Sequence, residues 1–186
     1  MLRPAPRPVA SRPKLSDAEI LARVAAGEIG ALGQLYDLHA AGLLRFLRRV
    51  APPGEAEDLM QATFLRAVAI ADTFDPEATS ARPWLFSLAS RLVQGKKRAL
   101  GRLSAALVNF ARFQLGAHAS APESGRDLQR ALLELSEHKR VAFVLTEIEG
   151  FTAEQVATMV GVPVGTVWTR LHHARRELRA RLGDVL

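Results

Sequence analysis

Cysteine is absent from this chain of 186 residues, which excludes disulfides, thiolate metal sites and thiol-based redox sensing. Aromatic residues make up only 6% of the sequence. No apolar run approaches the roughly 18 residues that a membrane-spanning helix needs. Residues 1–15 are rich in Arg and Pro and contain no apolar segment, so they are expected to form a disordered basic arm and not a signal peptide. These absences predict a cytoplasmic protein.

The sequence also carries none of the common signatures of an active site. It has no Gly-rich phosphate loop, no Ser/His/Asp or Cys/His constellation and no metal-ligand cluster. His39, His118 and His138 are isolated, and His172 and His173 would point about 100° apart on a helix with no third ligand nearby. We therefore expect no catalysis, no metal, no cofactor and no small-molecule substrate.

Basic residues are in excess instead. Lys and Arg number 25 against 19 Asp and Glu, which gives a formal net charge of +6. Because Lys and Arg neutralise phosphates, this excess favours a polyanionic partner such as nucleic acid.

Apolar residues recur with the 3.6-residue period of amphipathic helices, and no stretch alternates as a strand, so the predicted fold is all-α. Two helix starts are marked by capping boxes, at Ser16-Asp17-Ala18-Glu19 and at Thr152-Ala153-Glu154-Gln155. The predicted helices run from Ser16 to about Gly27, over 29–50 and 55–71, from Arg82 into a basic cluster, and over 127–135, 137–149, 153–159 and 164–182.

These helices group into two small domains joined by a flexible linker. The first domain covers residues 16–101, the linker 102–126 and the second domain 127–186. The linker contains the small-residue run Gly116–Pro122, which is typical of a flexible connection.

The second domain has the pattern of a helix-turn-helix. Ala157, Gly161 and Val167 fall at offsets of four and ten residues. A small Ala lets two helices cross closely, Gly accepts the positive φ of a tight turn, and Val fills the space between the helices. Val164–Leu182 is then a recognition helix able to enter a major groove. A helix pair without this function can show the same pattern by chance.

The outward face of that helix combines side chains suited to base edges with arginines suited to phosphates. The candidate DNA-contacting residues are Thr166, Trp168, Thr169, Arg170, His172, His173, Arg175 and Arg176. Trp and His are not the usual bidentate readers of guanine, so the DNA sequence that this helix would prefer is not predicted.

Two blocks of the sequence resemble the extracytoplasmic-function sigma factors of bacteria. Glu57–Ala67 followed by Arg82–Phe86 resembles region two of that family, and Arg140–Ala157 with Gly165–Arg175 resembles region four. The blocks stand in the family's order and separation. The resemblance implies a factor that confers promoter recognition and DNA melting on bacterial RNA polymerase during transcription initiation.

The resemblance also implies roles for residues of the first domain. Asp58, Gln61 and Phe64 would contact the clamp helices of the polymerase β′ subunit, with core packing as the alternative for Phe64. The loop 74–81 would capture a flipped base of the minus-ten promoter element, beside the melted strand. The minus-ten contacts on this basis are Asp75, Thr79, Ser80, Trp84, Arg91, Lys96 and Lys97, with anchoring in the core as the alternative for Trp84.

Region four would read the minus-thirty-five element and contact the polymerase β flap. The implied partners are therefore core RNA polymerase, promoter DNA and an anti-sigma factor, which in this family is often membrane-bound. Ser90-Arg91 stands where the family often has Arg-Asn, and Gly95 stands where it has Asp, which points to altered minus-ten recognition.

The alternative is a one-site transcriptional regulator that does not act through core polymerase, which the helix-turn-helix alone would support. The block that resembles region two favours the sigma factor, because a regulator would more often carry a ligand-binding or dimerisation domain at that place.

Overall fold

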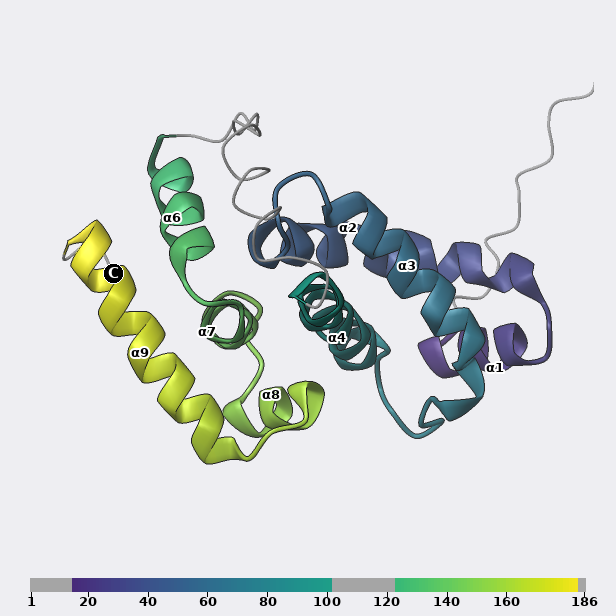
Figure 1. The fold of residues 1–186 in the computed structure, drawn as a ribbon. Coiled ribbons are helices and arrows are strands. Elements are labelled where there is room, and N and C mark those ends of the chain that lie inside the picture. Colours follow the sequence, from purple (N-terminus) through teal and green to yellow (C-terminus); the bar gives the residue numbers. More distant parts are fainter. Residues whose placement is uncertain (1–14, 102–122, 184–186) are drawn as a thin grey trace, which may run out of the picture.

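The computed structural model describes residues 15–101 and 123–183, and all regular structure within these ranges is helical (Figure 1). The first domain contains α1 (Asp17–Ala25), α2 (Leu32–Val50), α3 (Ala56–Ala69) and α4 (Arg82–Gly101), with short 3-10 turns at Ile29–Ala31 and Ala71–Thr73. The second contains α6 (Glu123–Glu134), α7 (Glu137–Phe143), α8 (Ala153–Val160) and α9 (Val164–Leu182). The prediction of an all-α fold with two small domains is confirmed. The basic arm and residues 102–122 of the predicted linker lie outside the described residues.

Both predicted capping boxes are present. The Ser16 Oγ accepts the Glu19 N–H at 3.2 Å, and the Glu19 carboxylate accepts the Ser16 N–H at 2.7 Å. Thr152 and Gln155 make the same reciprocal pair at 3.3 and 2.9 Å. Each pair satisfies backbone N–H groups that the first helical turn leaves without partners. Local sequence alone therefore determines where α1 and α8 begin.

Several helix boundaries differ from the sequence prediction, and residues 29–31 form a 3-10 turn before α2 begins at Leu32. Helix α6 begins at Glu123 instead of Asp127, so residues 123–126 are helical and do not belong to the linker. A glutamate in the first turn is favoured by the positive end of the helix dipole. Helix α3 ends at Ala69, where the chain turns into the 3-10 segment. Helix α7 changes into a π-helical stretch at Val144–Ile148.

Each domain buries the apolar stripes of its helices. Leu43, Leu47 and Leu59 of the first domain are fully buried, as are Val156 and Leu171 of the second. Burying one such side chain contributes about 1.5–3 kcal/mol, which is why the 3.6-residue period decides the fold.

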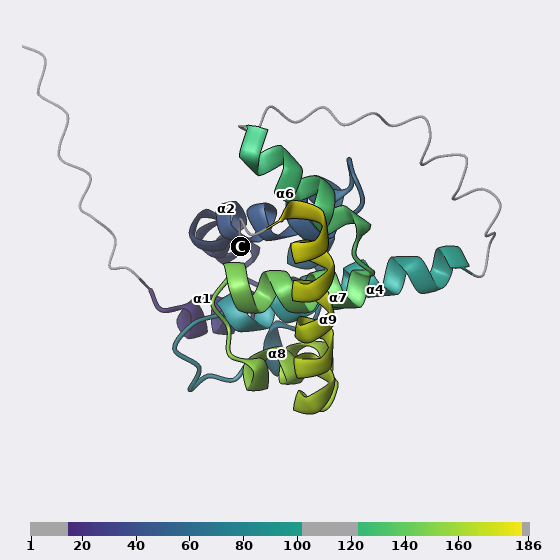
Figure 2. The same ribbon diagram turned by 90° about the vertical axis from the view of Figure 1, so that its left-hand side faces the viewer.

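The two domains are in contact, which the sequence does not predict. Helix α8 lies beside α4 in both views of the chain (Figures 1 and 2). Three buried aromatic rings cross the boundary in a row: Phe86 lies 4.9 Å from Phe46 of its own domain and 5.6 Å from Phe151 of the other, measured between ring centroids. The hydrophobic core is therefore continuous from one domain into the other.

Arg82, at the start of α4, is the centre of the polar part of this contact. Its guanidinium carbon lies 4.8 Å from the Phe86 ring centroid and 4.4 Å from that of Phe151. Its Nη2 donates to the Glu149 carbonyl at 3.0 Å and to the Glu149 carboxylate at 2.8 Å. The Ser87 hydroxyl adds a hydrogen bond to the Met159 carbonyl at 2.9 Å. Cation–π attraction and charge-assisted hydrogen bonds thus act on the same side chain.

Replacing Glu149 is expected to loosen the domain contact. Because the chain has no cysteine, donor and acceptor dyes attach only to the new thiols of Arg66→Cys on α3 and Glu154→Cys on α8, both at exposed positions. Glu149→Ala should weaken the contact by about 1–3 kcal/mol, since it leaves Arg82 without its carboxylate. The measurement is a fall in energy-transfer efficiency. Glu134→Ala is the control, because its partner Arg181 lies in the same domain. Equal falls in both variants would contradict the expectation.

Candidate nucleic-acid interface

The turn between α8 and α9 has the geometry that the sequence predicts. Gly161 ends α8 with φ 68° and ψ 45°, in the left-handed region that favours glycine. An added Cβ would meet no atom within 4 Å, so backbone conformation and not space requires the glycine. Val167 is fully buried and Ala157 is buried beside it. A helix-turn-helix is therefore present at residues 153–182.

Helix α9 buries one side and exposes the other. Val167, Leu171, Ala174 and Leu178 form the buried stripe, at the spacing of an amphipathic helix. Five of the predicted DNA-contacting residues on α9 are exposed, namely Trp168, Thr169, His172, Arg175 and Arg176. The other three are half-buried, namely Thr166, Arg170 and His173. Trp168 has 51% of its surface exposed, which is unusual for a large apolar side chain. The structure brings all eight residues together on one accessible helix.

Two of these side chains have properties that limit what they can do. The Thr169 hydroxyl donates to the Gly165 carbonyl at 2.9 Å, so it can only accept from a further partner. Burial lowers the pKa of the Arg170 guanidinium below its usual range. An arginine nevertheless stays charged in proteins, so Arg170 remains available to a phosphate.

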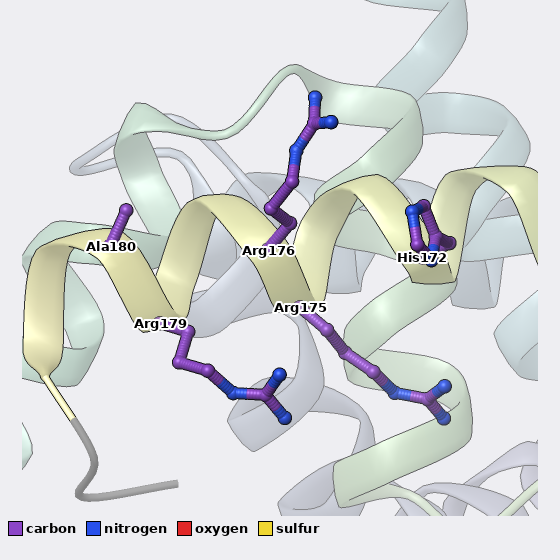
Figure 3. A pocket seen from close by; sticks show the side chains of 5 residues that line it. All are labelled: His172, Arg175, Arg176, Arg179 and Ala180. Carbon is purple, nitrogen blue, oxygen red and sulfur yellow. The ribbon is translucent and has the colours of Figure 1, made fainter.

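A hollow on the surface of α9 is lined almost wholly by basic side chains (Figure 3). His172, Arg175, Arg176 and Arg179 line it together with Ala180, at spacings that place them on one helix face. Figure 3 shows Arg175 and Arg179 extending to one side of the helix and Arg176 to the other. We call this the arginine hollow. Arg179, seven residues after His172, belongs to the same group of arginines suited to phosphates.

Some of the α9 arginines form ion pairs with acidic residues of the second domain. Arg175 donates to the Glu147 carboxylate at 2.5 Å, and Arg181 donates to Glu134 at 2.7 Å. Arg176 and Arg179 have no acidic hydrogen-bond partner within the described ranges. They are therefore the arginines of the hollow that can meet a phosphate without giving up an existing pair.

In the first domain, the loop 74–81 is fixed at both ends. Phe74 is buried and packs edge-on against Trp84, with ring centroids 5.4 Å apart. At the other end, the Ala81 N–H donates to the Asp17 carboxylate at 2.6 Å. Between these anchors Asp75 and Thr79 are exposed, as a contact with an outside partner requires.

Asp17 gathers three donors on one oxygen, Oδ2. Besides the Ala81 N–H, it receives the Ser80 hydroxyl at 3.2 Å and the His39 Nε2 at 2.9 Å. Burial alone would raise the pKa of the Asp17 carboxyl, but the hydrogen bonds from Ala81, His39 and Ser80 together hold that pKa below its usual 3.8. Asp17 and His39 are 22 positions apart, so no local sequence pattern predicted either as a functional residue.

The remaining predicted minus-ten contacts differ in how accessible they are. Arg91 is exposed on α4. Trp84 is half-buried against Phe74, which corresponds to the core-anchor interpretation. The Ser80 hydroxyl is occupied within the protein, since it donates to Asp17 and accepts the Arg82 N–H at 3.1 Å.

Two other parts of α4 bear on the prediction. Ser90 is fully buried and its hydroxyl has no hydrogen-bond partner among the described residues, so it cannot reach DNA in this conformation. The side chains of Lys96 and Lys97, in the last turns of α4, lie outside the described residues.

On α3, Asp58 and Gln61 are exposed, whereas Phe64 is 4% exposed and packs against Tyr36 at 5.0 Å between ring centroids. Phe64 thus occupies the core, the alternative left open by the sequence. The exposed apolar residue is its neighbour Leu65, at 71%. The i, i+3, i+7 spacing of 58, 61 and 65 places these three side chains on one face, and that spacing could have identified Leu65.

Comparison with known proteins agrees with both halves of this geometry. Residues 35–103 match the family described as Sigma-70 region 2, and residues 125–178 match Sigma-70, region 4. The chain is 33% identical over 167 residues to the ECF RNA polymerase sigma factor SigL of Mycobacterium tuberculosis, covering 87% of this chain and 94% of SigL. It is 31% identical over 166 residues to the RNA polymerase sigma factor CarQ of Myxococcus xanthus, covering 86% and 93%.

The chain belongs to the ECF RNA polymerase sigma factor family. It is a sigma factor of transcription initiation, with domains that bind core RNA polymerase and promoter DNA. The family is not one of catalytic enzymes.

Solved structures of sigma factors share this fold. The sigma factor RpoE of Bartonella quintana, solved with the anti-sigma factor NepR, matches with a TM-score of 0.69 and 26% identity, over 83% of this chain and 98% of RpoE. CnrH, solved with the cytosolic domain of CnrY, matches with a TM-score of 0.62 and 30% identity, over 91% and 99%. Both matches extend over most of the chain and so include both domains.

Over residues 15–101 and 123–183 of the sigma factor, no three His, Asp or Glu side chains gather where they could hold a metal ion. In the same ranges no helix combines the length and the apolar character needed to cross a membrane.

Arg176 is expected to contribute more to DNA affinity than Arg175. Arg176→Ala should weaken binding of the sigma factor to a short random-sequence duplex and reduce the salt slope of log Kd by about 0.9, the value for one lost phosphate contact. Arg175→Ala should have a smaller effect, because Glu147 already neutralises that side chain. Glu147→Gln is the matched variant and should raise affinity by releasing Arg175. Titration by fluorescence anisotropy at several salt concentrations measures all three. Equal slopes for the two arginine variants would contradict this ranking.

Asp17 is expected to make stability depend on pH in the acid range. Its folded pKa lies below the usual 3.8, so its contribution is complete well above that pH and is lost as the pH falls through the folded pKa. The difference in unfolding free energy between wild type and Asp17→Asn should therefore shrink between pH 6 and pH 3, as measured by urea denaturation. Asp37→Asn, an exposed carboxylate on α2, is the control. A difference that stays constant over this range would refute the expectation.

Proposed function

We propose that the two domains divide promoter recognition between them. In the second domain (residues 127–186, with α6 beginning at Glu123), α9 reads the minus-thirty-five element through Trp168 and His172 while its arginines hold the backbone. In the first domain (16–101), the loop 74–81 and the exposed side of α4 bind the minus-ten element. The observation that carries this proposal is the accessible face of α9, where base-reading side chains stand beside the arginine hollow.

We infer that α3 contacts the clamp helices of the polymerase β′ subunit. Asp58, Gln61 and Leu65 share one exposed face, and an exposed leucine among polar residues is suited to the centre of a protein interface. Phe64 supports this face from beneath through its contact with Tyr36. The second domain would contact the β flap.

The domain contact must open before both promoter elements can be engaged. Elements centred at minus ten and minus thirty-five are separated by about 25 base pairs, or about 85 Å of B-form DNA. A compact chain of this size has a radius of gyration of about 16 Å and is about 40 Å across. Bond geometry lets residues 102–122 span up to about 70 Å. The sigma factor therefore binds a promoter in a separated form, in which Arg82 has left Glu149 and Phe151.

An anti-sigma factor is the regulatory partner that fits this requirement. RpoE was solved with the anti-sigma factor NepR, and CnrH was solved with the cytosolic domain of CnrY. A partner that binds both domains while they are in contact would keep the promoter-binding form from assembling. We place the sigma factor in the cytoplasm, with core polymerase, and we assign it no catalysis of its own.

Run-off transcription tests the proposal. Purified core polymerase is combined with the full chain and a promoter library randomised at two elements about 25 base pairs apart. A defined subset of promoters should initiate, with preferred bases at both elements, and core polymerase alone should show neither preference. No enrichment over core alone would reject the function. Selective retention of library duplexes by the chain alone, measured in a pull-down without core polymerase, would favour the one-site regulator.

Leu65 gives a more specific test of the polymerase contact. Leu65→Asp should weaken binding to core polymerase by about tenfold or more, because it places a charge at the centre of an apolar contact. Thermal stability should change little, since the side chain is exposed in the free protein. The matched control is Leu38→Asp on α2, another exposed leucine off this face. Equal losses of affinity in the two variants would rule out the assigned face.

A further inference from the structure

Two polar residues occupy positions where the helix pattern calls for apolar ones. Asp17 lies on the same stripe of α1 as Ile20, Leu21 and Val24, all of which are buried. His39 lies on α2 in register with the buried Leu35 and Leu43 on either side of it. The side chains of Asp17 and His39 are only 11% and 13% exposed. A leucine would be the ordinary occupant of either position, so the packing of α1 on α2 does not explain the carboxylate.

The carboxylate has a different role, which is to hold the end of the loop 74–81. A buried carboxylate is costly unless donors surround it, and Asp17 receives two of its three donors from Ser80 and Ala81. Ala81 is also where α4 starts, since its carbonyl accepts the Leu85 N–H at 2.9 Å. The negative charge therefore sits at the positive end of α4. Asp17 thus joins α1 to the loop end and to the first turn of α4 at once.

The third donor fixes the direction of the carboxylate. His39 lies on α2, and its Nε2 donates to the same Asp17 oxygen that accepts from Ser80 and Ala81. With Phe74 held against Trp84, both ends of the loop are fixed to the body of the domain. The exposed groups of Asp75 and Thr79 between these ends take their positions from the two anchors. Loss of the Asp17 carboxylate would remove the hydrogen bonds that hold Ser80 and Ala81 to α1.

We propose that Asp17, oriented by His39, is a positioning residue for minus-ten recognition: it acts through Ser80 and Ala81 and does not itself touch DNA. This inference rests on the proposed assignment of the loop 74–81 to the minus-ten element.

The test compares full-length Asp17→Asn and Asp17→Leu in run-off transcription with core polymerase and the randomised promoter library. Leucine fills the apolar stripe of α1 but leaves the donors of His39, Ser80 and Ala81 without their acceptor, so Asp17→Leu should lower thermal stability and fail to hold Ser80 and Ala81. Discrimination among minus-ten bases should fall about tenfold in both variants, since each loses hydrogen bonds to a charged group. Preferences at the minus-thirty-five element should not change. Hydrogen exchange of the Ala81 amide should be faster in both.

Val24→Ala is the matched control, because it removes a buried side chain of the same stripe and leaves the carboxylate in place. It should lower the melting temperature and keep the minus-ten preferences. The proposal is overturned if Asp17→Leu keeps wild-type discrimination despite faster Ala81 exchange, or if Val24→Ala loses the same discrimination.

A further pair of variants separates this inference from the function on which it rests. Thr79→Ala and Asp75→Ala alter exposed loop residues and leave Asp17 untouched. If these variants keep the wild-type minus-ten preference while the wild type initiates specifically, the loop is not the minus-ten reader. That result would reject the positioning role together with the loop assignment, and it would leave the sigma factor activity standing.

Discussion

The contact between Phe86 and Phe151 is the interaction on which the arrangement of this molecule depends. It joins the core around Phe46 to the core of the second domain, and it creates the apolar surroundings in which Arg82 meets Glu149. The Arg82 side chain remains 39% exposed, so water still reaches part of this polar contact. An interface of a few rings and a partly hydrated ion pair is of the kind that holds domains together yet lets them part.

Much of the fold follows from signals within a few residues of one another. The capping boxes at Ser16 and Thr152 give two helix starts, and Gly161 gives the turn between α8 and α9. The buried stripe of α9 follows from its 3.6-residue period, and the exposed face that carries Trp168 follows from the same period. These features were predictable because each is decided by local hydrogen bonding, backbone conformation or helical phase.

The features that the sequence did not predict depend on contacts between distant residues, or on which of two neighbouring helical residues faces the core. Asp17 and Ala81 are 64 positions apart, and Arg82 and Glu149 are 67 apart, so no local pattern joins them. Phe64 and Leu65 are neighbours, yet one is buried and the other exposed, because one residue rotates a helix by about 100°. The sequence shows polar residues at positions 17 and 39 within apolar stripes. Their role depends on the hydrogen bonds that Ser80 and Ala81 of the loop 74–81 donate to Asp17, and the sequence does not show these.

The π-helical stretch at Val144–Ile148 has a consequence for how this chain can vary. It contains Glu147, which accepts a hydrogen bond from Arg175 of α9, while Glu149, just after the stretch, meets Arg82 of the other domain. Two carboxylates only two positions apart thus serve as internal counterions for two separate functional elements. An insertion, deletion or change of winding in this short segment would alter the charge displayed to DNA and the closure of the domains together. Selection on either property therefore constrains the other.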